Sequence, residues 1–386
     1  MSRMPLFFGA GLVALALWLT SCGNVPLHVP QTPDAARPTP PVPMPDAALP
    51  RTVLLRNKSQ WVAVPWPDLP GFEDDALFEA WNAFIKSCER PAPVFAPLCP
   101  EIRRLSIGTD AQQREWLLQR LQPYRVEPLQ AEASTGLLTA YFEPEFEARR
   151  QAGAGFSFAL HQAPAGLTAG RPWFTRQEME TLPAAQAALR GREIIYLADP
   201  VQALIMQIQG SGRVRVTEPD GSQRRLRLAY AANNGRPYQS IGRWLLDQGE
   251  LRDASWPGIR AWLMQNPQRT AELLWRNPRV VFFKEEPLND FDAAFGPRGA
   301  QGVPLTPGRS IAVDPDSIPY GTPVWLASVG PSLSLQRLVL AQDTGSAITG
   351  ALRADYFVGW GAQAGELAGR LKQPLRLWVL WPKQQR

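Results

Sequence analysis

The chain has 386 residues, with 40 Lys and Arg against 35 Asp and Glu for a formal net charge of +5, and it contains two histidines. The basic residues are scattered, without a Lys or Arg block or an aromatic ladder, so the composition excludes an extended nucleic-acid surface. His28 and His161 are too few for a Ser/His/Asp or Cys/His nucleophile or a usual zinc site. No phosphate-binding loop is present, since Gly296-Pro297-Arg298-Gly299 has proline where amides would be needed. Carboxylates remain as the proton-transfer groups.

Residues 1–21 are predicted to form a lipoprotein signal peptide. Arg3 precedes an apolar run that is too short for a membrane span and that ends in Leu19-Thr20-Ser21-Cys22. This is the acceptor pattern for diacylglycerol, so Cys22 is the predicted lipidated N-terminus. Gly23 follows instead of Asp, so we expect an outer membrane lipoprotein that faces the periplasm of a Gram-negative cell. The alternative is an uncleaved helix with an incidental cysteine.

Residues 22–50 are rich in proline, and this composition predicts an extended tether between the lipid and the rest of the chain. The remaining residues are enough for two domains by size. With Cys22 assigned to the lipid, Cys88 and Cys99 are the disulfide candidates of an oxidising compartment. Two buried thiols are the alternative, because pairing geometry cannot be read from a sequence.

The first part of the body favours helices followed by a strand. Helical spacing of apolar residues predicts a helix over 75–87, and Asp110 with Gln113 has the capping-box pattern that opens a second helix. Residues 137–142 have strand character, and the strand ends at Glu143-Pro144-Glu145. From about residue 148 to residue 192, Gly, Ala and Pro punctuate the chain.

Strands are then expected over 193–197 and 203–209. A hairpin follows, because residues 213–216 and 226–230 alternate with period two on either side of Pro219-Asp220-Gly221. Helical spacing returns at residues 238–245, 259–263 and 273–274. Strands dominate the remaining chain, at residues 279–283, 309–314, 323–327, 337–342 and 375–380. This order predicts a mixed β-barrel domain with peripheral helices and a smaller all-β domain inside its sequence.

Asp314, Asp343 and Asp355 each lie near the end of a short predicted strand. At Asp314 and Asp343 the apolar run stops and a turn follows, so these acids are expected at strand mouths where a cleft can form. Acid catalysis by a carboxyl group in the periplasm indicates cleavage of a glycosidic bond, in which the acid protonates the leaving oxygen. The alternative for each aspartate is a turn cap. Calcium could bind three carboxylates, but no Asp-rich loop supports such a site, and no metal is predicted.

Several ordered motifs identify a family resemblance. They are Gln209-Gly210-Ser211-Gly212, Tyr230-Ala231-Ala232-Asn233-Asn234-Gly235, Tyr238-Gln239-Ser240-Ile241-Gly242 and Gln342-Asp343-Thr344-Gly345-Ser346-Ala347-Ile348-Thr349-Gly350. With them the chain resembles the membrane-bound lytic murein transglycosylase A family from about residue 53 to residue 382. The C-terminal part also resembles the 3D domain, named for three aspartates that fall here on Asp314, Asp343 and Asp355. Ser346 and Tyr320 depart from the family pattern, and both are turn neighbours.

The resemblance implies a mainly β fold with peripheral α-helices, in which a double-psi β-barrel domain carries an inserted second β-barrel-like domain. We expect the barrel from residues 51–136 and 240–386, and the inserted substrate-binding domain from residues 137–239. The implied reaction cleaves the β-1,4 bond between N-acetylmuramic acid and N-acetylglucosamine in peptidoglycan and forms 1,6-anhydromuramic acid ends. No cofactor is expected.

The resemblance places the catalytic acid at Asp343. We expect it to protonate the glycosidic oxygen and then, as a carboxylate, to take the proton of the muramoyl C6 hydroxyl. Asp314 and Asp355 are expected to support it by bonding the turn or by raising its pKa through like charge, together with Thr344 and Gly345. The predicted substrate-binding residues are Thr139, Tyr141, Glu143, Gln207, Gln209, Gly210, Ser211, Gly212, Asn233 and Tyr238. For the aromatic residues the alternative is core packing, and Glu143 beside Pro144 has the alternative of a loop carboxylate.

Two classes of function stay open from the sequence, a lytic transglycosylase anchored to the outer membrane and a non-catalytic lipoprotein that binds or loosens the wall with the same barrel. A hydrolytic glycosidase is a third, distinguished by its reducing-end product. The expected partners are peptidoglycan glycan strands, the outer membrane through the N-terminal lipid, and a murein synthase or scaffold complex. No nucleic-acid partner is expected.

Overall fold

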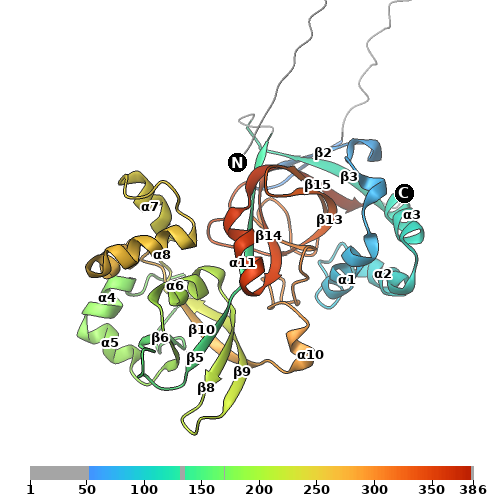
Figure 1. Ribbon diagram of the computed structural model, residues 1–386. Coiled ribbons are helices and arrows are strands. Elements are labelled where there is room, and N and C mark those ends of the chain that lie inside the picture. Colours follow the sequence, from blue (N-terminus) through green and yellow to red (C-terminus); the bar gives the residue numbers. More distant parts are fainter. Residues whose placement is uncertain (1–51, 131–134, 169, 384–386) are drawn as a thin grey trace, which may run out of the picture. The chain divides into compact units, whose positions relative to one another are not determined.

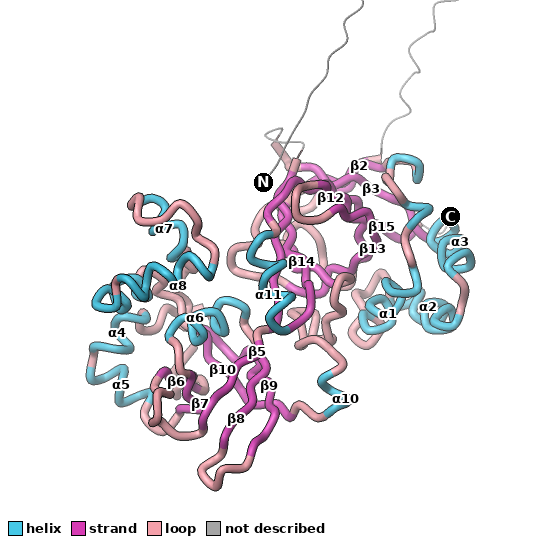
Figure 2. Tube along the Cα trace, viewed as in Figure 1, coloured by secondary structure: helices cyan, strands magenta, loops and turns pink. Residues whose placement is uncertain are grey.

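The computed structural model describes residues 52–130, 135–168 and 170–383, which Figure 1 shows coloured along the chain. The predicted signal peptide, Cys22 and the tether lie outside the described residues. A nine-stranded and a six-stranded sheet dominate this part of the chain, and helices surround them (Figure 2). Within the described ranges no helix has both the length and the apolar character needed to cross a membrane.

The nine-stranded sheet closes into a barrel. Its order is β1-β2-β3-β15-β12-β13-β11-β14-β4, and β4 pairs back with β15, so the six strands from β15 to β4 form a ring. In this ring β11 with β13 and β14 with β4 are parallel, and the other pairs are antiparallel. The strands are β1 (Val53–Leu55), β2 (Gln60–Ala63), β3 (Leu121–Glu127), β4 (Gly136–Glu143), β11 (Ser310–Val313), β12 (Pro323–Val329), β13 (Ser334–Asp343), β14 (Arg353–Trp360) and β15 (Lys372–Pro382). The predicted mainly β fold with a double-psi barrel is confirmed.

Strand β15 shows why the barrel needs a helical layer outside it. Leu375, Leu377 and Val379 belong to the core cluster inside the barrel. Trp378 and Leu380, which point the other way by the period of two, belong to a separate cluster outside it. An apolar outer face must be covered, and the covering elements come from the N-terminal part of the chain.

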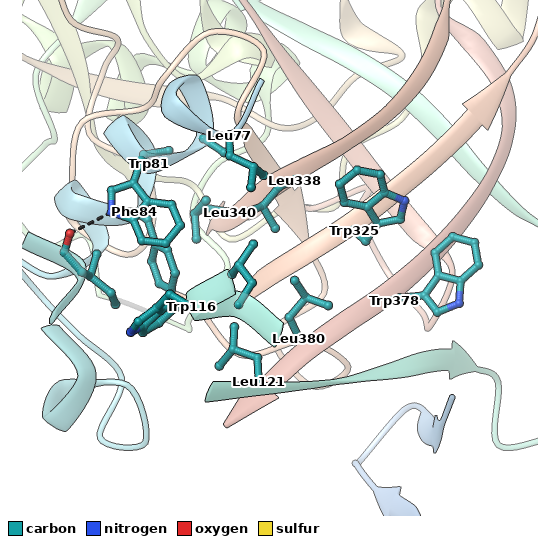
Figure 3. Packing of buried hydrophobic residues seen from close by; sticks show 14 of the residues in the cluster. Leu77, Trp81, Phe84, Trp116, Leu121, Trp325, Leu338, Leu340, Trp378 and Leu380 are labelled. Carbon is teal, nitrogen blue, oxygen red and sulfur yellow. Dashed lines mark hydrogen bonds between the residues drawn. The ribbon is translucent and has the colours of Figure 1, made fainter. Parts of the chain in front are cut away.

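The helices α1 (Leu77–Ser87), α2 (Cys99–Arg104) and α3 (Asp110–Arg120) cover this outer face. Figure 3 shows Trp81, Phe84 and Trp116 of these helices gathered beside Leu338 and Leu340 of β13, and the Trp81 indole donates to the Ile102 carbonyl at 2.8 Å. Each such buried side chain contributes about 1.5–3 kcal/mol. Cys88 and Cys99 form a disulfide, with their Cα atoms 5.6 Å apart, and it links the end of α1 to the start of α2. The capping box of α3 is formed by Thr109 and Gln112, one residue earlier than predicted.

The six-stranded sheet has the order β10-β9-β8-β5-β7-β6. Its edge strands β10 and β6 also contact each other, so the sheet is nearly a barrel. The antiparallel β8 and β9 are the predicted hairpin, which is confirmed, while β5 lies parallel to β8. The strands are β5 (Glu145–Arg149), β6 (Phe158–His161), β7 (Glu193–Leu197), β8 (Gly212–Thr217), β9 (Gln223–Asn233) and β10 (Val281–Pro287).

The strand predicted over 203–209 is wrong, because these residues belong to the helix α6 (Pro200–Gln209). Asp199 caps this helix by accepting from the Val201 amide, and Pro200 occupies its first turn. Its apolar residues are divided between two core clusters, with Met206 against the six-stranded sheet and Leu204 against the other helices. A helix buried on several sides has an apolar run without clear periodicity, so the sequence alone does not separate it from a buried strand.

The remaining helices are α4 (Arg176–Thr181), α5 (Pro183–Leu189), α7 (Ile241–Asp247), α8 (Trp256–Gln265), α9 (Thr270–Trp275), α10 (Asp290–Ala293) and α11 (Gly361–Arg370). The helical spacing at 238–245, 259–263 and 273–274 corresponds to α7, α8 and α9, whereas α2, α4, α5, α10 and α11 had no predicted counterpart. Single turns of 3-10 helix occur at Trp66–Asp68, Phe72–Asp74, Ala96–Leu98, Leu105–Ile107 and Pro267–Arg269.

The second sheet extends further along the chain than the predicted boundary at residue 239. Strand β10 pairs with β9 over Val281–Pro287, so the helices α7, α8 and α9 lie between two strands of the same sheet. The chain passes from the barrel to this sheet between β4 and β5 and returns through α10 to β11. We therefore propose residues 144–288 as the inserted domain.

Candidate active site

Asp343 and Asp355 lie in one row across the barrel wall. Asp343 ends β13 and pairs with Ala312 of β11, which on its other side pairs with Asp355 of β14. Residues opposite each other in neighbouring strands point to the same face, so the Cα atoms of the two aspartates lie about two strand spacings, or roughly 10 Å, apart. Asp355 therefore lies inside β14, whereas the sequence had indicated a position at the end of a strand.

Neutral hydrogen-bond donors hold the Asp343 carboxyl. The Ala300 amide donates to Oδ1 at 2.9 Å, and the Tyr141 hydroxyl donates to Oδ2 at 2.9 Å. No lysine or arginine in the described part of the chain forms an ion pair with it. Burial raises the pKa of Asp343 to about 6, and the charge of Asp355 also raises it, whereas the Thr344 and Ala300 amides and the Tyr141 hydroxyl lower it. Near pH 6 about half of the molecules therefore carry a proton on Asp343.

Tyr141 in β4 donates to Asp343 although the two residues are 202 positions apart in the sequence. Burial raises the pKa of Tyr141 well above its usual value, and the Asp343 charge raises it further, so the phenol keeps its proton and remains a donor. Its ring packs on Phe357 of β14 with the ring centroids 5.3 Å apart. The barrel thus fixes the direction from which Asp343 receives a hydrogen bond.

Asp355 accepts from the Thr139 hydroxyl, which itself accepts from Arg353 Nη2 at 2.8 Å. Burial raises the pKa of Asp355, against the smaller lowering effects of Thr139 and Arg353. Through its charge this carboxylate also raises the pKa of Asp343. Asp355 is therefore a half-buried neighbour of Asp343 with a hydrogen-bond partner of its own.

Asp314 is 3% exposed and holds the loop that follows Asp343. It accepts from the Gly350 amide at 2.7 Å and from Lys58 Nζ at 3.0 Å. Burial tends to raise the pKa of Asp314, but these donors outweigh it and the pKa is lowered. Thr344 closes the same loop, because its hydroxyl donates to the Val313 carbonyl at 2.9 Å.

A groove of about 460 Å³ opens beside Asp343. Its lining comes from the barrel strands, the loop 343–346, the loop 297–300 and the second sheet with its preceding segments. A smaller hollow of about 140 Å³ shares Arg279, Gly345 and Ser346 with this groove. Polar groups around one protonated carboxyl are suited to a carbohydrate, which offers many hydroxyl and amide partners. Within the described residues no group of three or more His, Cys, Asp or Glu side chains is placed to hold a metal ion.

The structure brings most of the predicted site residues together. The groove is lined by Tyr141, Gln209, Gly210, Ser211, Asp343, Thr344 and Gly345. The smaller hollow is lined by Gln207, Tyr238 and Asp355 as well as Gly345.

Four predicted substrate-binding residues line neither space, namely Thr139, Gly212, Asn233 and, as described below, Glu143. Thr139 is bonded to Asp355. Gly212 is buried where a Cβ would lie 2.0 Å from the Met206 sulfur, so it is a packing glycine. Asn233 closes a turn, because its Oδ1 accepts from the Gly235 amide at 2.8 Å.

Glu143, which was predicted to bind substrate, is instead fully buried between two arginines. Arg213 Nε donates to Oε2 at 2.8 Å, and Arg227 Nε donates to Oε1 at 2.6 Å. Both guanidinium groups also donate to the Phe295 carbonyl, and that of Arg213 lies 3.9 Å from the centre of the Trp360 ring. We refer to Glu143, Arg213 and Arg227 as the Glu143 clamp. It joins the end of β4 to β8, β9 and the returning chain, so it is unavailable to a ligand.

The loop 297–300 was missed as a site element. Gly299 approaches β13 so closely that a Cβ there would lie 2.5 Å from the Gln342 carbonyl oxygen, so a side chain at this position would push the Ala300 amide away from Asp343. The sequence did offer a signal, since Gly296 and Gly299 flank Pro297-Arg298, but only a phosphate-binding role was considered for this segment. Arg279, Lys284 and Arg298 also line the groove, and no motif had indicated them.

Comparisons with known proteins agree with this arrangement. Residues 137–284 match the family described as the MltA specific insert domain, and residues 309–381 match the 3D domain. The chain is 32% identical over 292 residues to membrane-bound lytic murein transglycosylase A of Vibrio cholerae, covering 70% of this chain and 74% of that protein.

Solved structures show the same likeness. The chain is similar to a lytic transglycosylase of Burkholderia pseudomallei, with 40% identity, a TM-score of 0.56 and coverage of 88% of this chain and 99% of the other. It is also similar to MltA from Neisseria gonorrhoeae, with 29% identity, a TM-score of 0.71 and coverage of 87% and 96% respectively.

Proposed function

The chain belongs to the membrane-bound lytic murein transglycosylase A family and is a peptidoglycan lytic transglycosylase, and from this premise we propose that Asp343 carries out its chemistry as a single acid and base. The bond cleaved is the β-1,4 link from N-acetylmuramic acid to N-acetylglucosamine, and the product ends in 1,6-anhydromuramic acid. The observation that carries this proposal is the half-buried Asp343, beside a polar groove, whose pKa of about 6 leaves it partly protonated. Since the chain is an enzyme, the non-catalytic wall-binding alternative is set aside.

In the first step Asp343 donates its proton to the glycosidic oxygen, the bond from that oxygen to C1 breaks, and N-acetylglucosamine leaves with a free 4-hydroxyl. Positive charge develops at C1 of the muramoyl ring. In the second step the C6 hydroxyl of the same ring attacks C1, and its proton passes to the Asp343 carboxylate. The acid is regenerated without water, so a second catalytic carboxylate is not needed.

Tyr141 and the Ala300 amide serve both steps. While Asp343 is protonated, they hold the carboxyl in one orientation, and after the first proton transfer both donate to the new carboxylate. Because neither carries a positive charge, they stabilise the carboxylate without lowering the pKa of Asp343 as far as an arginine or lysine would. Asp355 keeps its own partner in Thr139 and is assigned no proton transfer.

We further propose that Cys22 carries the lipid and that the enzyme faces the periplasm from the outer membrane. The signal pattern at residues 1–22 and the membrane-bound relatives support this proposal. A Cys22→Ala variant is expected to leave the membrane fraction while its specific activity on isolated peptidoglycan stays within twofold. Retention of that variant in the outer membrane would contradict the anchor. Recruitment of a murein synthase or scaffold remains part of the proposal.

The test of the reaction is a digest of purified peptidoglycan by the full chain in detergent, with the released muropeptides identified by mass spectrometry. The proposal expects products lighter by one water than the corresponding hydrolytic muropeptides, with no reducing muramic acid end. Asp220→Asn, in the exposed turn between β8 and β9, is the matched control and is expected to give the same products at the same rate. Reducing ends of full mass would instead identify a hydrolase.

A further inference from the structure

The groove beside Asp343 continues in two directions. On one side it shares Arg279, Gly345 and Ser346 with the smaller hollow. On another side it shares Glu286 and Arg298 with a hollow of about 430 Å³ that extends along α10. Of these three spaces, Asp343 lines only the central groove. An arginine therefore stands at each junction, with the catalytic carboxyl between them.

Both junction arginines have donors to spare. Arg279, just before β10, is half-buried and uses Nη1 to donate to the Arg236 carbonyl at 3.0 Å. Arg298 is exposed and uses Nη1 to donate to the Gly302 carbonyl at 3.0 Å. In the described part of the chain neither has a carboxylate oxygen within 4.0 Å. A guanidinium has five N–H donors in a planar fork, so each can still receive a carboxylate through two parallel bonds.

Among the described residues no carboxylate forms an ion pair with either arginine, although Glu89 and Asp292 line the hollow beside Arg298 and Asp355 lines the one beside Arg279. Glu286, which lines the groove, is paired with Lys284 at 2.9 Å. The Glu143 carboxylate is fully used by Arg213 and Arg227. The junctions thus differ from the Glu143 clamp, where every guanidinium has its anion within the protein.

The substrate of the proposed function carries an anionic group on every second sugar. In peptidoglycan every second sugar is muramic acid, whose lactyl group ends either in a carboxylate or in a stem peptide that bears carboxylates. Cleavage after a muramoyl ring places that ring on one side of the broken bond and the next muramoyl ring two sugars along on the other side. Two carboxylate-bearing groups therefore flank the point of cleavage.

We propose that Arg279 and Arg298 form two carboxylate subsites on either side of Asp343, each taking the lactyl or stem-peptide carboxylate of a muramoyl residue. This inference rests on the proposed function for the identity of the strand. It implies that the groove selects anionic muramoyl strands over neutral polymers of N-acetylglucosamine, since only the former satisfy both guanidinium groups.

The test measures binding by the full chain in detergent, in an Asp343→Asn background that does not turn over. The probes are peptide-bearing glycan strands, strands stripped of peptide that keep the lactyl carboxylate, and neutral chitohexaose. We expect Arg279→Gln and Arg298→Gln each to weaken binding of the anionic strands by roughly tenfold or more, while chitohexaose affinity stays within twofold. Loss confined to stripped strands identifies the lactyl carboxylate as the ligand, and loss confined to peptide-bearing strands identifies the stem peptide.

Arg224→Gln is the control, because Arg224 is exposed in β9 and lines none of the three spaces. It is expected to bind all three probes as the parent does. Equal losses on chitohexaose and on the anionic strands, or no loss on any strand, would overturn the proposal. Since binding is measured without turnover, these outcomes are independent of whether the wild type forms anhydro ends, which tests the proposed function separately.

Discussion

Asp343 and Glu143 are both buried or half-buried carboxylates at the end of a barrel strand, yet the fold gives them opposite environments. Asp343 receives hydrogen bonds from an amide and a phenol, so the proton on its carboxyl is not displaced by a cation. Glu143 receives two guanidinium groups and the support of a shared carbonyl. The partners, and not the position at a strand end, make Asp343 suited to the proton transfers that we propose and make Glu143 part of a buried ion-pair network.

Of the variants that test this comparison, Asp343→Asn is expected to have the largest effect on the rate. The amide keeps the size of the side chain but cannot donate and retake a proton, so the rate of release of anhydro-muropeptides should fall on the order of 10³-fold. The matched Asp220→Asn variant should keep the wild-type rate. Retention of a tenth or more of the activity by Asp343→Asn would move the acid to another residue.

Glu143→Gln is expected to lower the stability of the protein and to leave most of its activity, the reverse of Asp343→Asn. Both guanidinium groups would stay buried without an anion, so the free energy of unfolding should fall by about 3–5 kcal/mol. Folded molecules should retain most of their activity at low temperature. Chemical denaturation checks the first value, with Glu147→Gln as the control, because its pair with Arg215 is exposed and contributes at most about 1 kcal/mol. Unchanged stability together with lost activity would make Glu143 part of the chemistry.

Tyr141→Phe sharpens the description of Asp343. The phenol lowers the pKa of Asp343, so its removal should raise that pKa and shift the alkaline limb of the pH profile of kcat/KM upward. We also expect kcat to fall about tenfold, because the carboxyl loses one orienting bond. Tyr124→Phe, in β3, should leave the profile unchanged. A lower kcat with an unshifted pH profile would assign Tyr141 to packing alone.

The last prediction concerns the pH dependence of the free energy of unfolding, which isolates the ionisation of Asp343. The pKa of Asp343 is raised from 3.8 to about 6 in the folded state, so the folded chain binds more protons than the unfolded chain between these values and loses stability as pH rises through them. Asp343→Asn removes this loss. This rise of the pKa corresponds to at most about 3 kcal/mol, so the variant should be more stable than the wild type by up to that amount at pH 7.5, with the difference shrinking below pH 4. An equal difference at both pH values would argue against ionisation as its cause.

The barrel strands β4, β11, β12, β13 and β15 were predictable from the sequence because each is a short apolar run that is bounded by turn residues, whereas β1, β2 and β3 were not predicted. Asp343 was predicted through its motif together with the apolar run that stops at it. By contrast, Glu143 was misassigned because its partners Arg213 and Arg227 lie 70 and 84 residues further along the chain, and pairing at that range depends on the folded sheet. Arg279 and Arg298 escaped for the same reason, since isolated arginines carry no local pattern until the fold places them beside a groove.

The most direct test of the central claim is the protonation state of Asp343 itself. Infrared difference spectra between the wild type and Asp343→Asn, recorded from pH 4 to pH 8, isolate the carboxyl band of this one residue. The neutral environment in the barrel predicts a midpoint at about pH 6, with the protonated band still present at pH 5. A midpoint at or below pH 4 would mean that Asp343 is an ordinary ionised carboxylate, and the single-acid account would be contradicted.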